Sequence, residues 1–491
     1  MKEHRRLKYG GFSVIITVLV IIAVLAVNVL VSYLEDRNGW KADFTPTRAY
    51  TLDKSAETAI RDLTCDVIIY SFIPGGQSSR YSTMTENIVA LFDGASERIE
   101  SKNVDPIVNP SKLEQFSSDT KTLSSFAVVV AQKDNEANYH AFNEDELVEF
   151  NSNNSKYYFV LQRWITSALV YMRTGIRQNV YLLTGHGEDI QDASLQVMLS
   201  RIRRENFEVQ ELSLVSGQTT LKQGDVVIVT EPKSDLTENE YNTLIQFLDD
   251  HYGSMMIIAA RLIDDAGNKL TRYHNLLDDF NLSLEDGVIA ETDDQHHQTN
   301  LPKNIQLIAD QAHVVSSAVR SANEPVWVTE ATGITYKYGT GTTIGSIYEE
   351  KFSSVLTSYA SSVLVPWEYA SDFRATDYET GIHTAAGAYE RRNTGITGTE
   401  NTTTTRILIL GSQSIATGDY LGNQNILRNG INWLAGKNAG DTLVSVGIDL
   451  TSSYVQLTQL QMRIWFAVLV AAVPAALLVA GIVVWIRRRN L

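Results

Sequence analysis

Four consecutive residues, Gly185, His186, Gly187 and Glu188, carry the side chains in this chain best suited to acid/base or ligand-binding chemistry. The apolar run VYLL precedes them and a helical pattern follows, so we expect a turn at the carboxyl end of a buried strand. Loops at that end of an open α/β sheet line the ligand crevice. His186 and Glu188 could there bind a polar ligand.

A structural role for the same turn is the competing interpretation, and we favour it. The two glycines permit a sharp change of chain direction. Glu188 or Asp189 would favour the positive end of the following helix. The turn is therefore a candidate crevice site that chain geometry alone can also explain.

Two other predicted strands end in polar residues. Thr230 and Glu231 follow one of them, and Ser412 and Gln413 follow the other. If the sheet is parallel, these residues point to the same rim as His186. This convergence is geometric and indicates no particular chemistry.

The sequence offers few metal ligands. His296 and His297 stand beside Asp293 and Asp294 in the run DDQHHQTN and could bind a metal. Ligands crowded into one flexible polar loop rarely form a closed site, so we expect a solvated loop. Cys65 is the only cysteine, which excludes an intramolecular disulfide and a cysteine-based zinc cluster. We predict no metal and no cofactor.

Several catalytic motifs are absent from the sequence: the GxxxxGK[ST] phosphate loop, the GxSxG elbow, the HExxH helix and the CxxC pair. The run GTGTT at Gly339 lacks the lysine of a phosphate loop. We therefore predict no catalytic residues, and any energy-dependent process that involves this chain must be driven by another subunit.

The first half of the chain predicts an α/β domain. Asp53 or Ser55 can cap a helix whose buried face holds Ala56 and Ile60, and the strand CDVIIYSF follows. FAVVVAQ, from Phe126, reads as a second core strand. YYFVLQRWITSALVYMRTG reads as one long helix that ends at Gly175.

From Asn179 onward, strand and helix patterns alternate, which predicts a doubly wound, mostly parallel sheet. VYLLTG, DVVIVTEP, MMIIAA and RILILGS read as strands. LQVMLSRIRREN, TENEYNTLIQFLDDHYG and NILRNGINWLAG read as helices, and Thr237 and Glu240 have capping-box spacing in the second. The stretch from Trp367 to Thr405 is rich in Thr, Gly and Tyr, and its run ENTTTT reads as an exposed loop or edge hairpin.

Two apolar runs are long enough to cross a membrane of about 30 Å as helices. One extends from Phe12 to Leu34 and reads as an uncleaved signal anchor. The other extends from Ile464 to Ile486, with Trp465 near one end, and three arginines follow it. The basic clusters lie on the terminal side of each run, so we predict a two-pass protein of the cell (plasma) membrane with both termini cytoplasmic and the middle outside.

Charge and small residues suggest which partners to expect. The basic ends carry a net charge of +6, so the rest of the chain carries −22 to give the total of −16. Such an acidic surface disfavours binding of nucleic acid and of anionic lipid headgroups. Ala472, Ala476 and Ala480 recur every fourth position in the second span, a spacing that lets another helix pack closely, although alanine is also simply common there.

The ordered pattern resembles the GldG family, the auxiliary subunits of ABC-type transport systems first associated with gliding motility. The resemblance runs nearly end to end. It depends on the signal anchor, DFTPTRAYTLDKSAETAIRDL, the LLTGHGE turn, VVIVTEPKSDLTENE, RILILGSQSI with GINWLAG, and a final span ending in WIRRR. The Thr/Gly-rich stretch before Arg406 departs from the family pattern, and a gliding role does not follow from membership.

The resemblance implies a middle domain similar to the class I glutamine-amidotransferase-like fold, without its activity. Those enzymes need a nucleophilic cysteine at a strand-to-helix turn, whereas Cys65 precedes a strand of the first domain. It also implies two partners, a cytoplasmic ABC ATPase and an ABC-2 type permease. The expected segments are a basic tail (1–11), a span (12–34), an N-terminal α/β domain (40–175), a larger α/β domain (176–440), a linker (441–463), a second span (464–486) and a basic tail (487–491).

The leading hypothesis is thus a non-enzymatic, membrane-anchored accessory subunit of an ABC-type transport system, whose outer region contacts substrate or permease. One alternative is a membrane-anchored envelope hydrolase with His186 and Glu188 as acid/base groups. Another is a sensor or adhesin that binds a ligand without a transporter. The sequence identifies neither the substrate nor the direction of transport.

Overall fold

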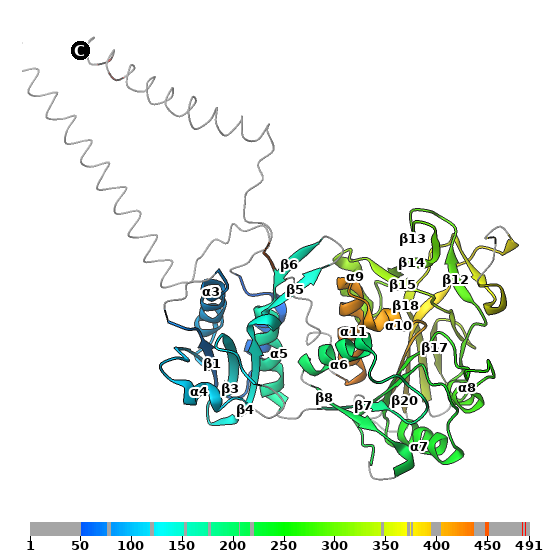
Figure 1. Ribbon diagram of the computed structural model, residues 1–491, viewed down its shortest axis with the longest axis horizontal. Coiled ribbons are helices and arrows are strands. Elements are labelled where there is room, and N and C mark those ends of the chain that lie inside the picture. The colour runs from blue at the N-terminus through cyan, green and yellow to red at the C-terminus, as the bar shows by residue number, and fades with distance from the viewer. Residues whose placement is uncertain are drawn as a thin grey trace, which may run out of the picture. The chain divides into compact units, whose positions relative to one another are not determined.

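A computed structural model describes residues 51–75, 80–117, 122–151, 155–174, 178–205, 207–216, 220–344, 348–370, 374, 377–393, 404–436, 447–450, 484 and 487. The chain divides into two compact units, Met1–Ile448 and Asp449–Leu491. Nearly all described residues belong to the first unit, which is a mixed α/β structure (Figure 1).

The predicted spans, 12–34 and 464–486, lie outside the described residues except for Val484, and so do Ala472, Ala476 and Ala480. Within the part of the chain that is described, no helix has the length and apolar character needed to cross a membrane.

The first sheet has four strands in the order β2-β1-β3-β4. Only β1 and β2 run parallel; the other neighbours are antiparallel. Its strands are β1 (Val67–Phe72), β2 (Ile99–Val104), β3 (Ala127–Gln132) and β4 (Asn135–Asn143). The elements around it are α2 (Lys54–Arg61), α3 (Arg80–Ala95), α4 (Pro110–Glu114), the 3-10 helix η1 (Glu144–Leu147), the hairpin of β5 (Val148–Asn151) and β6 (Lys156–Phe159), and α5 (Leu161–Thr174).

Local signals at the start of this region act as predicted. The Asp53 side chain caps α2 by accepting a hydrogen bond from the Ala56 backbone N–H at 2.8 Å. Ala56 and Ile60 are buried, and the strand from Phe126 is β3. The single long helix was wrong at its start, because Tyr157 to Phe159 form strand β6 and α5 begins only at Leu161. Three consecutive aromatic residues suit a pleated hairpin, a preference that the helical periodicity concealed.

The second sheet has eleven strands, nine of them in the order β13-β14-β18-β20-β21-β10-β9-β7-β8, with β15 on β14 and β17 on β18. In chain order the strands are β7 (Gln178–Leu183), β8 (Phe207–Leu212), β9 (Val226–Thr230), β10 (Ser254–Ile258), β13 (His297–Gln298), β14 (Leu301–Ala309), β15 (Val326–Thr329), β17 (Gly341–Ile344), β18 (Tyr348–Thr357), β20 (Thr384–Asn393) and β21 (Thr404–Leu410).

The prediction of a mostly parallel sheet was wrong for half of it. The five neighbours β8, β7, β9, β10 and β21 are parallel, whereas β20, β18, β17, β14, β15 and β13 pair antiparallel. The Thr, Gly and Tyr-rich stretch supplies β20, whose residues Ala385 to Tyr389 are buried between β18 and β21. Of the run expected to be an exposed loop or edge hairpin, Thr404 and Thr405 are buried in β21, and the rest lies outside the described residues. DDQHHQTN is likewise not only a loop, since His297 lies in the short strand β13.

Helices cover both faces of the parallel strands. One face packs against α6 (Ala193–Arg204), α9 (Val314–Ser321), α10 (Gln413–Thr417) and α11 (Leu421–Leu434). The other packs against α7 (Glu238–Asp249) and α8 (Thr271–Asp278). Side chains alternate between the two cores: Met256 and Ile258 of β10 face the first helices, and Met255 and Ile257 face the second.

The remaining elements are short. β11 (Leu282–Leu284) pairs with β16 (Ile334–Tyr336), and β12 (Val288–Glu291) pairs with β19 (Ser362–Val365). The 3-10 helices η2 (Leu214–Ser216) and η3 (Trp367–Tyr369) and the strand β22 (Ile448–Asp449) complete the set.

Two helical glycines test how closely α11 packs. A Cβ at Gly422 would lie 2.4 Å from the backbone oxygen of Pro325, whereas one at Gly94 of α3 would meet no atom within 4 Å. We expect Gly94→Ala to raise the free energy of unfolding by about 0.5–1 kcal/mol through helix propensity. Gly422→Ala should lower it, because a backbone carbonyl cannot move aside cheaply. Scanning calorimetry of both variants measures this, and equal stabilisation by both would contradict the packing of α11.

Candidate functional site

The predicted turn follows β7 directly, at the carboxyl end of the parallel strands. Gly185 and Gly187 have φ angles of 111° and 85°, in the region that disfavours residues with a side chain. A Cβ at Gly187 would also lie 3.0 Å from the Cβ of Lys233. Both glycines are therefore required by the turn itself, as the structural interpretation expects.

His186 lies between two carboxylates. Its Nε2 is 3.3 Å from Oε2 of Glu240, on α7, and its Nδ1 is 3.4 Å from Oε1 of Glu188. Only 3% of His186 is exposed, and the side chains of Glu188 and Glu240 are 1% and 3% exposed. The ring of Tyr273, on α8, meets the imidazole edge-on with centroids 6.0 Å apart. The cluster is buried.

Glu188 does not act on the following helix, which corrects the prediction. Its Oε2 accepts a hydrogen bond from the backbone N–H of His186 at 2.8 Å. The N-cap of α6 is Asp192, whose carboxylate accepts from the Leu195 N–H at 3.0 Å. The sequence predicted Glu188 or Asp189 at the positive end of the following helix, whereas α6 begins only at Ala193.

The strand order explains why this place matters. Counted along the chain, the parallel strands lie in the order second, first, third, fourth, fifth, so the winding reverses between β7 and β9. Ligands of open α/β sheets bind outside the carboxyl ends at such a switch point. Here the two loops close on each other, since the His186 carbonyl accepts from the backbone N–H groups of Lys233 and Ser234 at 2.7 and 2.9 Å. The crevice is filled by the protein.

The electrostatics favour an imidazolium held by carboxylates. Burial opposes the charge on His186, but Glu188 and Glu240 outweigh it and raise the pKa of the imidazole. Burial likewise opposes ionisation of Glu188, yet His186 and backbone N–H groups lower its pKa. Against the same burial penalty, Thr237 and His186 lower the pKa of Glu240, in the predicted capping box of α7. The three groups stabilise one another and bind the turn to α7.

Ser412 has a different role from His186. It caps α10, its hydroxyl accepting from the Ser414 N–H at 3.2 Å and donating to the Thr329 carbonyl at 2.7 Å. Ser412 is 3% exposed. Among the described residues no hydrogen bond or ion pair joins it to His186, so the convergence of strand ends does not produce one site.

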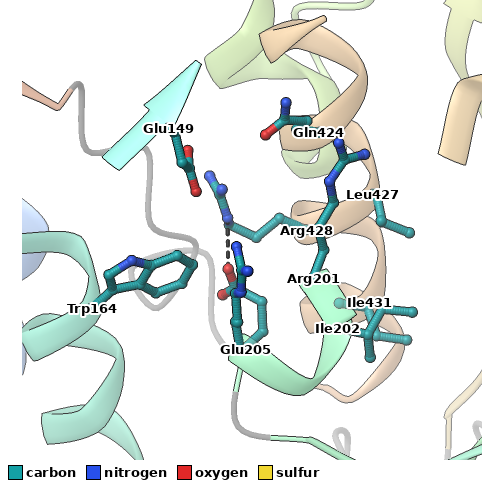
Figure 2. Close-up of a pocket in the computed structure, with 10 residues that line it drawn as sticks. Glu149, Trp164, Arg201, Ile202, Glu205, Gln424, Leu427, Arg428 and Ile431 are labelled. Carbon is teal, nitrogen blue, oxygen red and sulfur yellow. Dashed lines mark hydrogen bonds and ion pairs between the residues drawn. The ribbon is translucent and has the colours of Figure 1, made fainter. Parts of the chain in front are cut away.

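The second candidate site is a pocket that no sequence signal identified (Figure 2). It has an empty volume of about 330 Å³, part of it open to solvent. Figure 2 shows the Arg428 side chain extending between Glu149 and Glu205. Its lining comes from β5, α5, α6 and α11 and consists of Glu149, Trp164, Arg201, Ile202, Arg204, Glu205, Gln424, Leu427, Arg428 and Ile431.

The arginines around this pocket are paired. Nε of Arg428 lies 2.7 Å from Oε1 of Glu205, with both side chains under a tenth exposed. Arg163 pairs with Glu149. The other two arginines are paired as well: Arg204 lies 3.8 Å from Glu146, and Arg201 lies 2.9 Å from Asp419. Burial opposes the charge of Glu149, but Arg163 and Arg428 outweigh it and lower its pKa. The pocket is charge-balanced and offers no nucleophile.

One signal could have drawn attention to the pocket. The run NILRNGINWL, predicted to be a helix, is buried in the structure although it contains Arg428 and three asparagines. An arginine in a buried helix needs a carboxylate partner. The partner, Glu205, lies 223 residues earlier in the chain, so the sequence could indicate the need but not the pair.

The run DDQHHQTN, expected to be a solvated loop, makes paired contacts. Nε2 of His297 lies 3.2 Å from Asp294, and the His296 ring stacks on Tyr359. In the described part of the chain, no three His, Cys, Asp or Glu side chains gather as a metal ion would require.

Comparison with known proteins gives only distant structural likeness. The chain matches no protein-family model and no curated protein. It is similar to the N-terminal domain of mmIFT52, at 12% identity and a TM-score of 0.35 over 52% of this chain and 97% of that one. A ThuA-like protein from Bacteroides uniformis matches at 10% identity and a TM-score of 0.32, over 52% and 91% of the two chains. One from Parabacteroides merdae matches at 12% and 0.30, over 53% and 91%.

The His186 cluster predicts a specific pH dependence. The contribution of His186 is fully present below the ordinary histidine pKa of about 6.5 and is lost as the pH rises through its raised folded value. The contributions of Glu188 and Glu240 are present above about pH 4.3 and are lost as the pH falls through their lowered values. Stabilisation by the cluster is therefore greatest between these limits.

The melting temperatures of the wild type and His186→Gln measure this contribution. Their difference should be larger at about pH 5.5 than at about pH 8.5. His313→Gln is the control, because burial lowers the pKa of His313 to about 4. The pH dependence of its contribution to stability therefore has the opposite sign to that of His186. A His186→Gln difference that does not change with pH would contradict an imidazolium in the cluster.

The buried pair of Arg428 and Glu205 should be costly to break. Arg428→Leu leaves a buried carboxylate without its partner and should lower the free energy of unfolding by about 3–5 kcal/mol. Adding Glu205→Gln should recover part of this loss. Arg61→Leu, which removes an exposed pair with Asp62, should cost less than about 1 kcal/mol. Denaturant titration of the wild type, Arg428→Leu, Glu205→Gln, the double variant and Arg61→Leu provides the comparison, and additive effects at Arg428 and Glu205 would contradict their coupling.

Proposed function

We propose that this chain is a non-enzymatic, membrane-anchored accessory subunit of an ABC-type transport system, similar to the GldG family. One observation carries the proposal: the switch point of the parallel strands, where an α/β enzyme would bind its substrate, is filled by the protein's own contacts around His186. With 3% of His186 exposed, its imidazole is not available as an acid or base for an envelope polymer. A domain without catalysis at that place is suited to recognition.

The proposal includes a relation to the class I glutamine-amidotransferase-like fold without its activity. The parallel strands with helices on both faces support it. The only cysteine, Cys65, precedes β1 in the other sheet, and its Sγ lies 3.6 Å from the carbonyl of Met172. Burial raises the pKa of this thiol, which disfavours the thiolate that a nucleophile requires.

The sequence supplies the remaining support. The two apolar runs, 12–34 and 464–486, would anchor the chain at both ends and leave the domain with the His186 turn outside the cell membrane. The absence of a phosphate loop requires the ATPase to be a separate subunit. In this proposal the partners are a cytoplasmic ABC ATPase and an ABC-2 type permease, and the cell (plasma) membrane is the location.

Co-purification tests the proposal. The full chain, tagged and cross-linked in its native membrane and then solubilised in a mild detergent, should bring down a protein with a phosphate loop and a multi-span membrane protein, both identified by mass spectrometry. If neither is recovered after cross-linking, the chain is not such a subunit.

A pair of matched variants tests whether the second span makes the contact. Replacing Ala472, Ala476 and Ala480 together with leucine should reduce recovery of the multi-span protein, because larger side chains prevent close helix approach. Replacing Ala467, Ala471 and Ala475, which have the same spacing on another helical face, should leave recovery unchanged. Equal loss with both sets would show that the alanine stripe is not specific.

A further inference from the structure

A second pocket lies at the carboxyl end of β10, among the ends of the parallel strands but apart from the His186 cluster. It has an empty volume of about 370 Å³, which includes open solvent. The chain after β10, the start of α8, the link between β11 and β12, and η3 form its walls. Its lining residues are Ala260, Arg261, Leu262, Ile263, Lys269, His274, Leu284, Glu285, Asp286 and Trp367.

Two cations of this pocket have no anionic partner. The Arg261 guanidinium lies 4.8 Å from the ring centroid of Trp367, a contact that holds its plane. Among the residues that the structure describes, no carboxylate lies within 4.0 Å of Arg261 or Lys269, and neither side chain donates a hydrogen bond. This differs from the pocket of Figure 2, where each arginine has a carboxylate.

The two carboxylates of the pocket differ from each other. Oε2 of Glu285 lies 3.0 Å from Nδ1 of His383, so Glu285 is engaged. Asp286 is exposed and has no hydrogen bond or ion pair among the described residues. The pocket therefore presents unpaired cations and an unpaired carboxylate that do not contact one another.

The walls that carry these charges are held in place. Trp367 packs against the apolar cluster of β12 and β19. A turn around Asp264 fixes the loop before Lys269, since the Asp264 carboxylate accepts from the backbone N–H of Asn268 at 2.8 Å, and Ile263 bridges to Lys269. His274 meets the Leu262 carbonyl at 3.2 Å through Nε2. The backbone around these charges is therefore held in place, and Trp367 also positions the Arg261 guanidinium, which reduces the ordering that binding requires.

We propose that this pocket binds a small zwitterion, an amino acid or a short peptide. Arg261, with Lys269 beside it, would bind the carboxylate, because a guanidinium presents paired donors that match two carboxylate oxygens. Asp286 would accept from the ammonium group. Leu262, Ile263 and Leu284 would contact small apolar side chains. A simple anion would face Asp286, and a simple cation would face Arg261 and Lys269, so charge complementarity favours a molecule with both charges.

This inference does not depend on the proposed transport role, because binding to the isolated chain requires no partner. The probes are L-alanyl-L-alanine and the twenty protein amino acids, added to the purified full chain in detergent and observed by saturation-transfer NMR. At least one probe should bind. If none binds, the pocket is not a zwitterion site.

Blocked forms of the bound probe separate its two charges. For L-alanyl-L-alanine these are N-acetyl-L-alanyl-L-alanine, without the ammonium, and L-alanyl-L-alaninamide, without the carboxylate. Each should bind about tenfold or more weakly than the parent, as expected for the loss of one charged hydrogen-bonding group. Undiminished binding of the acetylated form would identify a simple anion site instead and overturn the inference.

Variants place the binding in this pocket. Arg261→Gln and Asp286→Asn should each weaken binding of the parent probe about tenfold or more. In the Arg261→Gln variant, L-alanyl-L-alaninamide should bind about as weakly as L-alanyl-L-alanine. The carboxylate that the amide lacks would have no guanidinium to bind in this variant. Arg320→Gln and Asp278→Asn change exposed residues outside the pocket lining and should bind as the wild type does. Equal weakening by the pocket and control variants would overturn the assignment.

Discussion

Burial of the parallel strands on both faces determines where polar chemistry is available in this chain. The neighbours β7, β9, β10 and β21 lie between two layers of helices, and β9 and β10 place alternate side chains in each apolar core. The edge strand β8 differs, because Glu208 and Glu211 are exposed. A charged side chain in the fully buried strands β9 and β10 would lose its hydration without gaining a partner. Polar groups are therefore displaced to the strand ends, and each end is either closed by internal contacts or left open.

Internal contacts close two of the strand ends. After β7, His186 lies between two carboxylates and its carbonyl accepts from two backbone N–H groups. Among the described residues, His186 Nδ1, Glu188 Oε1 and Glu240 Oε1 are buried without a hydrogen bond, so opposite charge stabilises this cluster more than hydrogen bonding does. After β21, Ser412 caps a helix. Contacts of this kind stabilise the loops that follow the strands. Motifs with the composition of an active site can thus have structural roles.

Local sequence signals predicted the helix starts, whereas the features that the sequence did not predict depend on contacts between residues far apart in the chain. The cap at Asp53 and the capping box of Thr237 and Glu240 act within four residues, so the sequence contains all that they need. β20 is different: its Thr- and Gly-rich surroundings resemble a loop, and only its position between β18 and β21 makes Ala386 and Ala388 core residues. Arg428 also required a partner from a distant helix. Tertiary context therefore overrode local composition in both places.

Whether the charges at a strand end are paired decides whether that end can offer them to a ligand. An ion pair such as Arg428 with Glu205 can be buried because each charge replaces the hydration of the other. Unpaired charges such as Arg261 and Asp286 are tolerated only where water or a ligand reaches them. Such groups cost little while solvated and become favourable contacts when a complementary molecule displaces the water. The strand end after β7 is closed by internal contacts, whereas the pocket after β10 is partly open to solvent, so of these two ends it is the second that presents unpaired charges to a ligand.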